Sequence, residues 1–173
     1  MPNVFSYQVI KDTTEHAVIK LTGKFDGTGG QENNHARIAA NSLYGALNAN
    51  ATPGLLSQGG SPLPYYGLNL NRLWYDCSST GDVELYWHAD TTVPLMYLNG
   101  NGEYDGAGNW VTIPNAAKGT ANCNGDISVV TRGMVANDSY TIIAEFRKEN
   151  EYYQRGQFND PAAFNYGNYS TRP

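Results

Sequence analysis

Charged residues, cysteine and histidine are all scarce in this chain. Lys, Arg, Asp and Glu together make up 16% of its 173 residues, and the formal net charge is −5. An average soluble protein is about one quarter charged. A general phosphate-binding surface needs clustered Lys and Arg, so we expect no nucleic acid among the partners. The chain also lacks an apolar run of roughly 20 residues, so we expect no association with a membrane. Its first residues lack the basic start and apolar core of a secretion signal.

Only two cysteines, Cys77 and Cys123, are present. Two thiols do not build a disulfide scaffold, and a domain of this size buries enough apolar surface to do without one. We therefore expect two free thiols in a protein that is assembled in a cytoplasm. Neither cysteine stands at zinc-ligand spacing from a histidine.

The three histidines, His16, His35 and His88, do not belong to a recognisable catalytic motif. His88 and Asp90 are two residues apart and would share one face of a strand. A hydrolase would also need an activated nucleophile, and the chain has no Gly-x-Ser-x-Gly elbow. We therefore expect no catalytic residues and no cofactor.

Several carboxylates lie in expected turns, where carboxylates are able to bind calcium. The spacing around residues 99–109 fails the EF-hand pattern, and Asp and Asn are also the residues that turns use to satisfy their own backbone. The glycine runs at 27–30 and 100–102 lack the Gly-Lys-Ser/Thr of a phosphate loop and are interpreted as turns. We expect no metal site; the turn carboxylates are Asp26, Asp82, Glu103, Asp105 and Asp126.

Short runs of alternating apolar and polar residues, separated by turns rich in Gly, Asn and Asp, fill most of the chain. In the run at 83–88, Val83, Leu85 and Trp87 fall on one face of an extended strand. Runs of this kind at spacings of roughly 10 residues are typical of antiparallel sandwiches and barrels. The sequence therefore predicts an all-β fold, namely an antiparallel β-sandwich of jelly-roll-like type.

The expected strands cover residues 4–10, 16–25, 68–77, 83–88, 95–98, 110–114, 126–132 and 140–147. The turn at 12–15 predicts a hairpin between the first two, and we expect the last two to form a closing hairpin. Pro114 makes the run before it a short edge strand. The segment 36–47 fits both a helical stripe and a strand alternation, and we favour a strand.

After residue 148 the alternation ends, which divides the chain into a sandwich domain, 1–148, and a C-terminal extension, 149–173. The extension is too aromatic for an inert disordered tail. We expect an irregular arm that lays its rings on a neighbouring molecule; wrapping over its own sandwich is the alternative. The breaker-rich loop at 48–64 is a second expected contact. The interface residues predicted in the arm are Tyr152, Tyr153, Phe158, Phe164, Tyr166 and Tyr169.

The tryptophans allow a sugar-binding interpretation as well. Exposed aromatic rings combined with Asn and Asp are typical of jelly-roll modules that bind glycans. Trp87 shares a face with two aliphatic residues, and that face is most simply the core. Trp74 lies on the face opposite Leu73 and Tyr75, so it is the better candidate for an exposed aromatic.

Segments along nearly the whole chain carry a family resemblance. They read VIKLTG at 18–23, GDVELYWHA at 81–89, LNGNGEYD at 98–105, SYTIIAEFRK at 139–148 and QRGQFNDPAAFNYG at 154–167. In these segments the chain resembles a family of virion structural proteins of tailed phages, similar to those of marine phages, including phages of cyanobacteria. The motifs are mostly turns and strand ends, so they indicate the fold more than the role.

The resemblance implies a non-enzymatic component of a phage particle. The expected role is a capsid decoration or cement protein bound outside the major capsid lattice. It would sit on the capsid surface of the virion after assembly in the host cytoplasm. Its partners would be the major capsid protein and further copies of itself, for which a trimer is one arrangement. Two alternatives stay open: a neck or tail adaptor, and a glycan-binding module for host attachment.

Overall fold

The computed structural model describes residues 3–33, 35–44, 46, 66–78, 80–106, 112–118 and 120–149. The expected contact loop at 48–64 lies outside these residues. So do the six aromatic residues predicted for the C-terminal arm and all of the extension after Glu149. The fold and the candidate site below concern the described residues.

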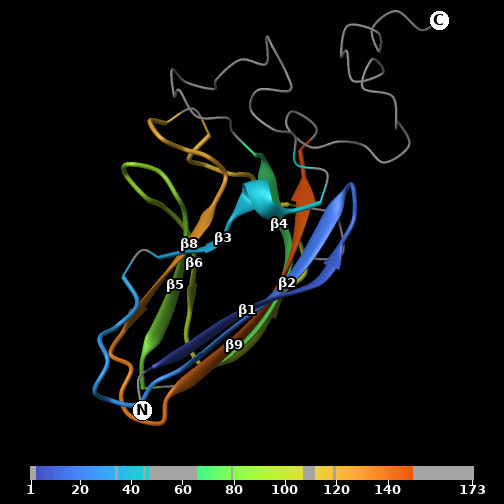
Figure 1. The fold of residues 1–173 in the computed structure, drawn as a ribbon. Coiled ribbons are helices and arrows are strands. Elements are labelled where there is room, and N and C mark those ends of the chain that lie inside the picture. The colour runs from blue at the N-terminus through green and yellow to red at the C-terminus, as the bar shows by residue number, and fades with distance from the viewer. Residues whose placement is uncertain are drawn as a thin grey trace, which may run out of the picture.

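Strands and turns account for nearly all of the described chain, and they form two layers (Figure 1). The one helical element among the described residues is the single 3-10 turn η1 (Ala40–Ser42). The predicted all-β class and antiparallel sandwich are confirmed. The strands are β1 (Val4–Asp12), β2 (His16–Lys24), β3 (His35–Ile38), β4 (Leu68–Cys77), β5 (Asp82–Trp87), β6 (Val93–Leu98), β7 (Asn101–Tyr104), β8 (Ile127–Arg132) and β9 (Ser139–Lys148).

The strand order is that of a jelly roll with one strand added. Sheet A has the order β1-β2-β9-β4-β7, and sheet B has the order β3-β8-β5-β6. Leaving β1 aside, the pairs β2–β9, β3–β8, β4–β7 and β5–β6 are those of one long hairpin rolled into two four-stranded sheets. β1 pairs only with β2 among the described strands, so it lies at the outer edge of sheet A with no counterpart in sheet B.

The rolled topology overturns the predicted closing hairpin. Both runs are strands, but β8 lies in sheet B beside β5, whereas β9 lies in sheet A between β2 and β4. The turn at 133–138 crosses from one sheet to the other. It is held by Asp138, whose carboxylate accepts hydrogen bonds from the backbone N–H of Val135 at 2.7 Å and the hydroxyl of Thr80 at 2.6 Å. Sequence alternation cannot distinguish such a crossing from a hairpin, because both need a short polar turn.

Two further strand predictions need correction. Only the start of 36–47 is a strand: β3 ends at Ile38, and η1 follows because the carboxylate of Asp126 accepts a hydrogen bond from the backbone N–H of Ala40 at 2.7 Å. Within the expected edge strand at 110–114, the described residues make one isolated bridge, in which Ile113 exchanges two backbone hydrogen bonds with Leu70. The hairpin of β1 and β2 is confirmed.

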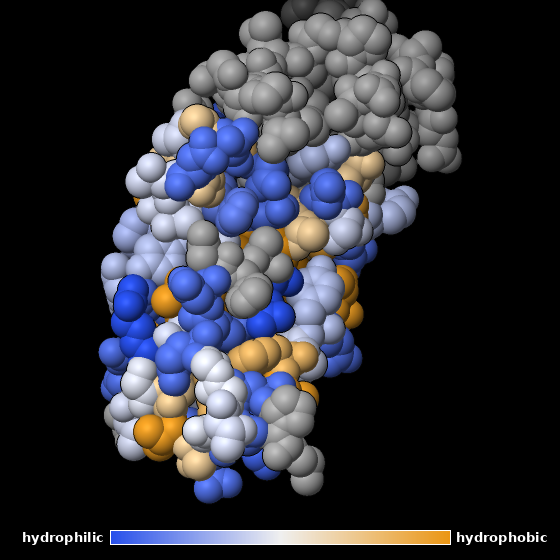
Figure 2. Space-filling model, turned by 60° about the vertical axis from the view of Figure 1, so that its left-hand side comes forward, coloured by the Kyte–Doolittle hydropathy of each residue, from blue (hydrophilic) through white to orange (hydrophobic). Residues whose placement is uncertain are grey.

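The core lies between the sheets and uses the faces that the alternation predicts. On β2, Ala17, Ile19 and Leu21 are at most 2% exposed. Trp87 of β5 is completely buried, as its shared face with Val83 and Leu85 predicts. Figure 2, in which the left-hand side of Figure 1 comes forward, shows a mainly hydrophilic surface with hydrophobic atoms only in small separate patches. None of the helical structure in the described residues is long and apolar enough to cross a membrane.

Candidate functional site

The outer edge strand β1 is the most exposed strand of the sandwich. It is nine residues long, whereas β3 and β7, which are also edge strands, have four residues each. The fourth edge strand, β6, carries Pro94, which cannot donate a ladder hydrogen bond. A long edge without proline presents unpaired N–H and C=O groups that can pair with a strand of another molecule. Of the four described edges, β1 is therefore the one best suited to strand addition.

Side chains on the core-facing side of β1 are only half covered. Tyr7 and Val9 pair with Leu21 and Ile19 of β2, which are buried, yet they are 39% and 40% exposed themselves. The cause is topological, because β1 has no counterpart strand in sheet B, and the sheet B residue that does cover it, Arg37 of β3, lies over Phe5 and not over Tyr7 or Val9. Ile10, the extra residue of a bulge, is 51% exposed. We name Tyr7, Val9, Ile10 and the 61% exposed Tyr44 the β1 overhang.

The N-terminal half of β1 is anchored by aromatic and cation contacts. The ring of Phe5 meets that of Phe25 edge-on, with centroids 5.5 Å apart, and the guanidinium of Arg37 lies 4.7 Å from the Phe5 centroid. Arg37 donates to the buried carboxylate of Glu32, which also accepts a hydrogen bond from the hydroxyl of Tyr140. Burial and the neighbouring Glu32 raise the pKa of Tyr140. This network fixes β1 to the body of the sandwich.

The other end of β1 is anchored by a buried lysine. The ammonium of Lys148 donates to the carboxylate of Asp12 at 2.5 Å and to the carbonyl oxygens of Thr13 and Tyr44 at 2.6 and 2.8 Å. Burial lowers the pKa of Lys148, and the attraction of Asp12 opposes that shift. Asp12 also accepts a hydrogen bond from the backbone N–H of Tyr44. The overhang is therefore a positioned surface, with both ends of its strand attached to the core.

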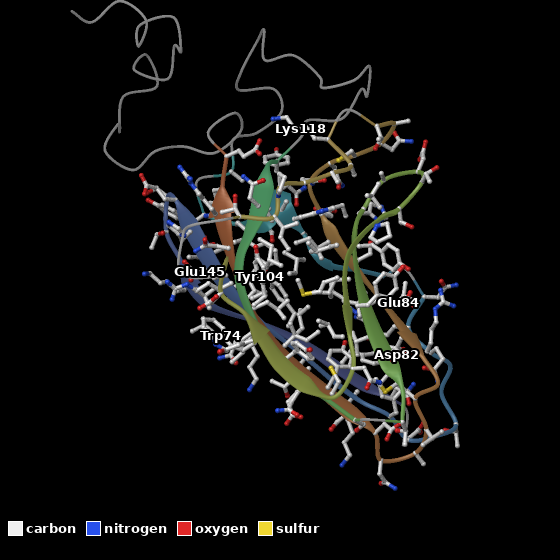
Figure 3. All side chains as sticks on the ribbon, turned by 180° about the vertical axis from the view of Figure 1, so that it is seen from behind. Trp74, Asp82, Glu84, Tyr104, Lys118 and Glu145 are labelled. Atoms are coloured by element: carbon white, nitrogen blue, oxygen red, sulfur yellow. The ribbon has the colours of Figure 1, made fainter. Side chains whose placement is uncertain are left out.

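The structure places the predicted aromatic Trp74 on the outer face of sheet A, where it is 38% exposed, as the sequence predicts. Its cross-strand neighbours are Glu103 on β7 and Ile143 on β9. Figure 3 shows Trp74 and Glu145 on one side of the sandwich and Glu84 on the opposite side.

A polar and aromatic network covers part of the outer face of sheet B. The carboxylate of Glu84, which is almost fully buried, accepts hydrogen bonds from Arg132 at 2.8 Å and from the hydroxyl of Tyr86 at 2.6 Å. Tyr97, which is 62% exposed, packs edge-on against Tyr86. Burial opposes ionisation of Glu84, but the hydrogen bonds from Arg132 and Tyr86 outweigh it and lower the pKa of the carboxyl. The hydrogen bond to Glu84 raises the pKa of Tyr86.

The histidines make pairs that the sequence did not indicate. The ring nitrogen Nδ1 of His88 lies 2.8 Å from the hydroxyl oxygen of Ser128, whereas the carboxylate of Asp90 accepts a hydrogen bond from Asn122. Ser128 is completely buried, so a substrate would not reach its hydroxyl. On the outer face of sheet A, Nδ1 of His16 lies 3.1 Å from a carboxylate oxygen of Glu145.

The prediction of turn carboxylates is wrong for Asp82 and Glu103, which lie in strands β5 and β7, whereas Asp26 supports the backbone of its own turn. Asp26 accepts hydrogen bonds from the backbone N–H groups of Thr28 and Gly29 at 2.8 and 2.9 Å, and these bonds lower its pKa. The carboxylate of Asp126 instead joins two segments, because it accepts hydrogen bonds from the backbone N–H of Ala40 and from the side-chain amide of Asn124. No group of three or more His, Cys, Asp and Glu side chains that could hold a metal ion occurs within the described ranges.

Both cysteines are buried and free, which confirms the expectation of two unpaired thiols. Burial raises the pKa of Cys77 to about 12, and the pKa of Cys123 is raised for the same reason. Only the thiolate is a strong nucleophile or metal ligand, so these two side chains act as small core residues.

The β1 overhang and the polar cluster of His16, Asn71 and Glu145 were not predicted from the sequence. The alternation of β1 looks like that of any half-buried strand, and its exposure follows from the missing opposite strand. The cluster combines residues from β2, β4 and β9, which are distant in the chain. The single available signal was the long run without proline at 4–12.

Comparisons with known proteins give no relative for this chain. No family model matches it, and neither the curated proteins nor the solved structures contain a match.

Proposed function

We propose that this protein is a non-enzymatic structural component of a phage particle, and specifically a decoration protein bound to the outside of the major capsid lattice. The motifs that resemble phage virion proteins are the reason for proposing a phage particle. The jelly-roll order of eight of the nine described strands supports the proposal. That fold serves in viral capsid domains, but also in lectins and enzymes, so it does not by itself select the role.

The β1 overhang is the observation on which the proposed binding role rests. It combines an unpaired strand edge with two core-facing side chains, Tyr7 and Val9, that remain 39% and 40% exposed. A strand added next to β1 would extend sheet A and cover Tyr7 and Val9, giving main-chain hydrogen bonds and apolar burial together. The occupant we propose is an extended segment of the major capsid protein; a second copy of this chain is the other source of such a strand.

Such binding would stabilise a shell by joining neighbouring subunits. Each bound copy buries apolar area across a joint, and this area must be exposed again when the shell opens. The net gain per copy is smaller than the area suggests, because association costs translational freedom and side-chain order. Repeated over a lattice, a modest gain still raises the temperature at which internal pressure opens the shell.

The experiment compares particles assembled with and without the protein. We expect many copies distributed over the shell, and DNA release at a lower temperature when the protein is absent. Particles that contain the protein in many copies but release DNA at an unchanged temperature would contradict a cementing role. Purified particles that lack the protein altogether would contradict the whole proposal.

Copy number distinguishes the neck or tail adaptor from decoration. An adaptor would be found by particle imaging in a few copies at one vertex, and the overhang would then bind a neck or tail protein. The β1 edge would bind its partner in the same way in an adaptor, so the two roles differ only in the position of the protein on the particle.

A further inference from the structure

The outer face of sheet A carries an aromatic side chain beside a cluster of polar ones. Across the sheet, Lys20, Ile143, Trp74 and Glu103 stand in one row on β2, β9, β4 and β7. The next row contains Arg72 opposite Glu145. Residues diagonally opposite on paired strands are roughly 7–8 Å apart, within reach of long and aromatic side chains. Glu145 is diagonal to Trp74, and Figure 3 shows both on the same side of the sheet.

A bulge in β4 aims an additional side chain at this cluster. The register of β4 against β9 shifts between Leu70 and Arg72, which makes Asn71 the extra residue. Its amide donates to the carboxylate of Glu145 at 3.1 Å, although Asn71 is only 6% exposed. Bulges often re-aim a side chain at a binding site. Here the bulge gives Glu145 a fixed position instead of leaving it mobile in solvent.

The cluster borders a small polar hollow. The hollow measures about 230 Å³ and is lined by Glu15, His16, Asn71, Thr112 and Arg147. This volume is below the roughly 300–1,000 Å³ of pockets for drug-sized ligands, so it suits a single small polar group. Nδ1 of His16 lies 3.1 Å from Glu145, but the atom is buried and has no aligned hydrogen bond. The contact holds the imidazole beside the carboxylate, and both side chains remain partly exposed, His16 by 28% and Glu145 by 22%.

We infer that this face binds a neutral, hexose-containing glycan. The indole of Trp74 would stack on the apolar C–H face of one sugar ring, and the partly exposed side chains of Glu145 and His16 would exchange hydrogen bonds with the hydroxyls of the next. Asn71 would hold Glu145 in position for that contact. Sugar hydroxyls both donate and accept, which suits a site that holds a carboxylate acceptor next to amide, imidazole and guanidinium groups. The inference concerns a different surface from the β1 overhang and does not depend on the proposed role in a particle.

The charges of the face argue against other occupants. The acidic Glu103 and Glu145 stand beside the basic Lys20 and Arg72, so the face lacks the basic stripe that binds the phosphates of a nucleic acid. A stable protein interface needs a larger apolar centre than Trp74 and Ile143 provide. A neutral ligand with many hydroxyls meets neither difficulty.

The test is a glycan array probed with the labelled full-length protein, followed by calorimetry with the glycans that bind. We expect binding by the intact protein, about tenfold weaker binding by Trp74→Ala, and a smaller loss for Glu145→Gln. The matched control is Tyr97→Ala, which removes an exposed aromatic from the outer face of sheet B and should leave affinity unchanged. Circular dichroism establishes that each variant is folded.

Three results would overturn the inference: no glycan bound by the intact protein, unchanged affinity in folded Trp74→Ala, or an equal loss in Tyr97→Ala. A charged variant of the overhang, Val9→Lys, should keep glycan binding while losing particle binding. Failure of one proposal is therefore distinguishable from failure of the other.

Discussion

The two longer edge strands of the sandwich, β1 in sheet A and β6 in sheet B, differ in how well their exposed edges are protected against pairing with another strand. Both strands contain a bulge, but β6 also carries Pro94, and its Tyr97 packs on Tyr86, whose hydroxyl donates a hydrogen bond to Glu84. β1 has no proline, and four of its apolar residues are 39 to 60% exposed: Val4, Tyr7, Val9 and Ile10. Proteins usually protect such edges against pairing. The difference leaves the edge of β1 open to strand pairing, whereas that of β6 is blocked.

The largest expected effect comes from breaking the support of β1. Glu32→Ala leaves the guanidinium of Arg37 and the hydroxyl of Tyr140 without their acceptor. Removing one partner of a buried ion pair costs about 3 kcal/mol or more in the free energy of unfolding. Urea unfolding at pH 7 measures this loss. A change of less than about 1 kcal/mol would show that the network does not hold β1 in place.

Charged residues in the β1 overhang should prevent β1 from binding a partner strand, so that β1 would then bind no better than β6. The double variant Val9→Lys with Ile10→Lys places two charges on side chains that are already 40% and 51% exposed. We therefore expect little change in folding stability but a loss of about 30-fold in affinity for particles, equivalent to about 2 kcal/mol at a binding hot spot.

Sedimentation of the protein with particles that lack it measures that affinity. The control is Tyr97→Lys, which adds a charge at the closed edge and should bind like the wild type. Equal binding by the overhang variant and the control would contradict a role for β1.

Acid should weaken the closed edge through Glu84. Because the pKa of Glu84 is lowered in the folded protein, its ionised form contributes stability that is fully present above its ordinary value of 4.5 and is lost as the pH falls through the lowered pKa. We expect wild type to exceed Glu84→Gln by about 1 kcal/mol at pH 7. Urea unfolding from pH 7 to pH 3 should show that difference shrinking. A constant difference across this range would contradict the assignment of the charge to the Arg132 and Tyr86 contacts.

Replacing the proline of β6 should have the smallest effect. Pro94→Val restores an N–H donor and makes β6 resemble β1, with a change in unfolding free energy of about 0.5 kcal/mol or less. We expect increased self-association at high concentration, measured by analytical ultracentrifugation, because a strand edge has been opened. A variant as monomeric as the wild type would mean that the bulge and Tyr97 close this edge without help from the proline.

The sequence alone was enough to predict the all-β class, the buried face of β5, the exposure of Trp74 and the two free thiols. These properties depend on a period of two and on residue chemistry, which are local and are legible in the chain. The resemblance to phage virion proteins also came from sequence segments, and the role that it implies stays a prediction. The six aromatic residues of the C-terminal arm stay predictions in the same way.

Only the tertiary structure decided which strands are neighbours and therefore which surfaces are open. The roll separates β8 from β9, and it adds β1 to sheet A without an opposite strand, so Tyr7 and Val9 face the core side and still meet solvent. It also brings His16, Asn71 and Glu145 together from three strands. Strand alternation specifies the face of each side chain but carries no information about the element on the other side, which depends on long-range pairing.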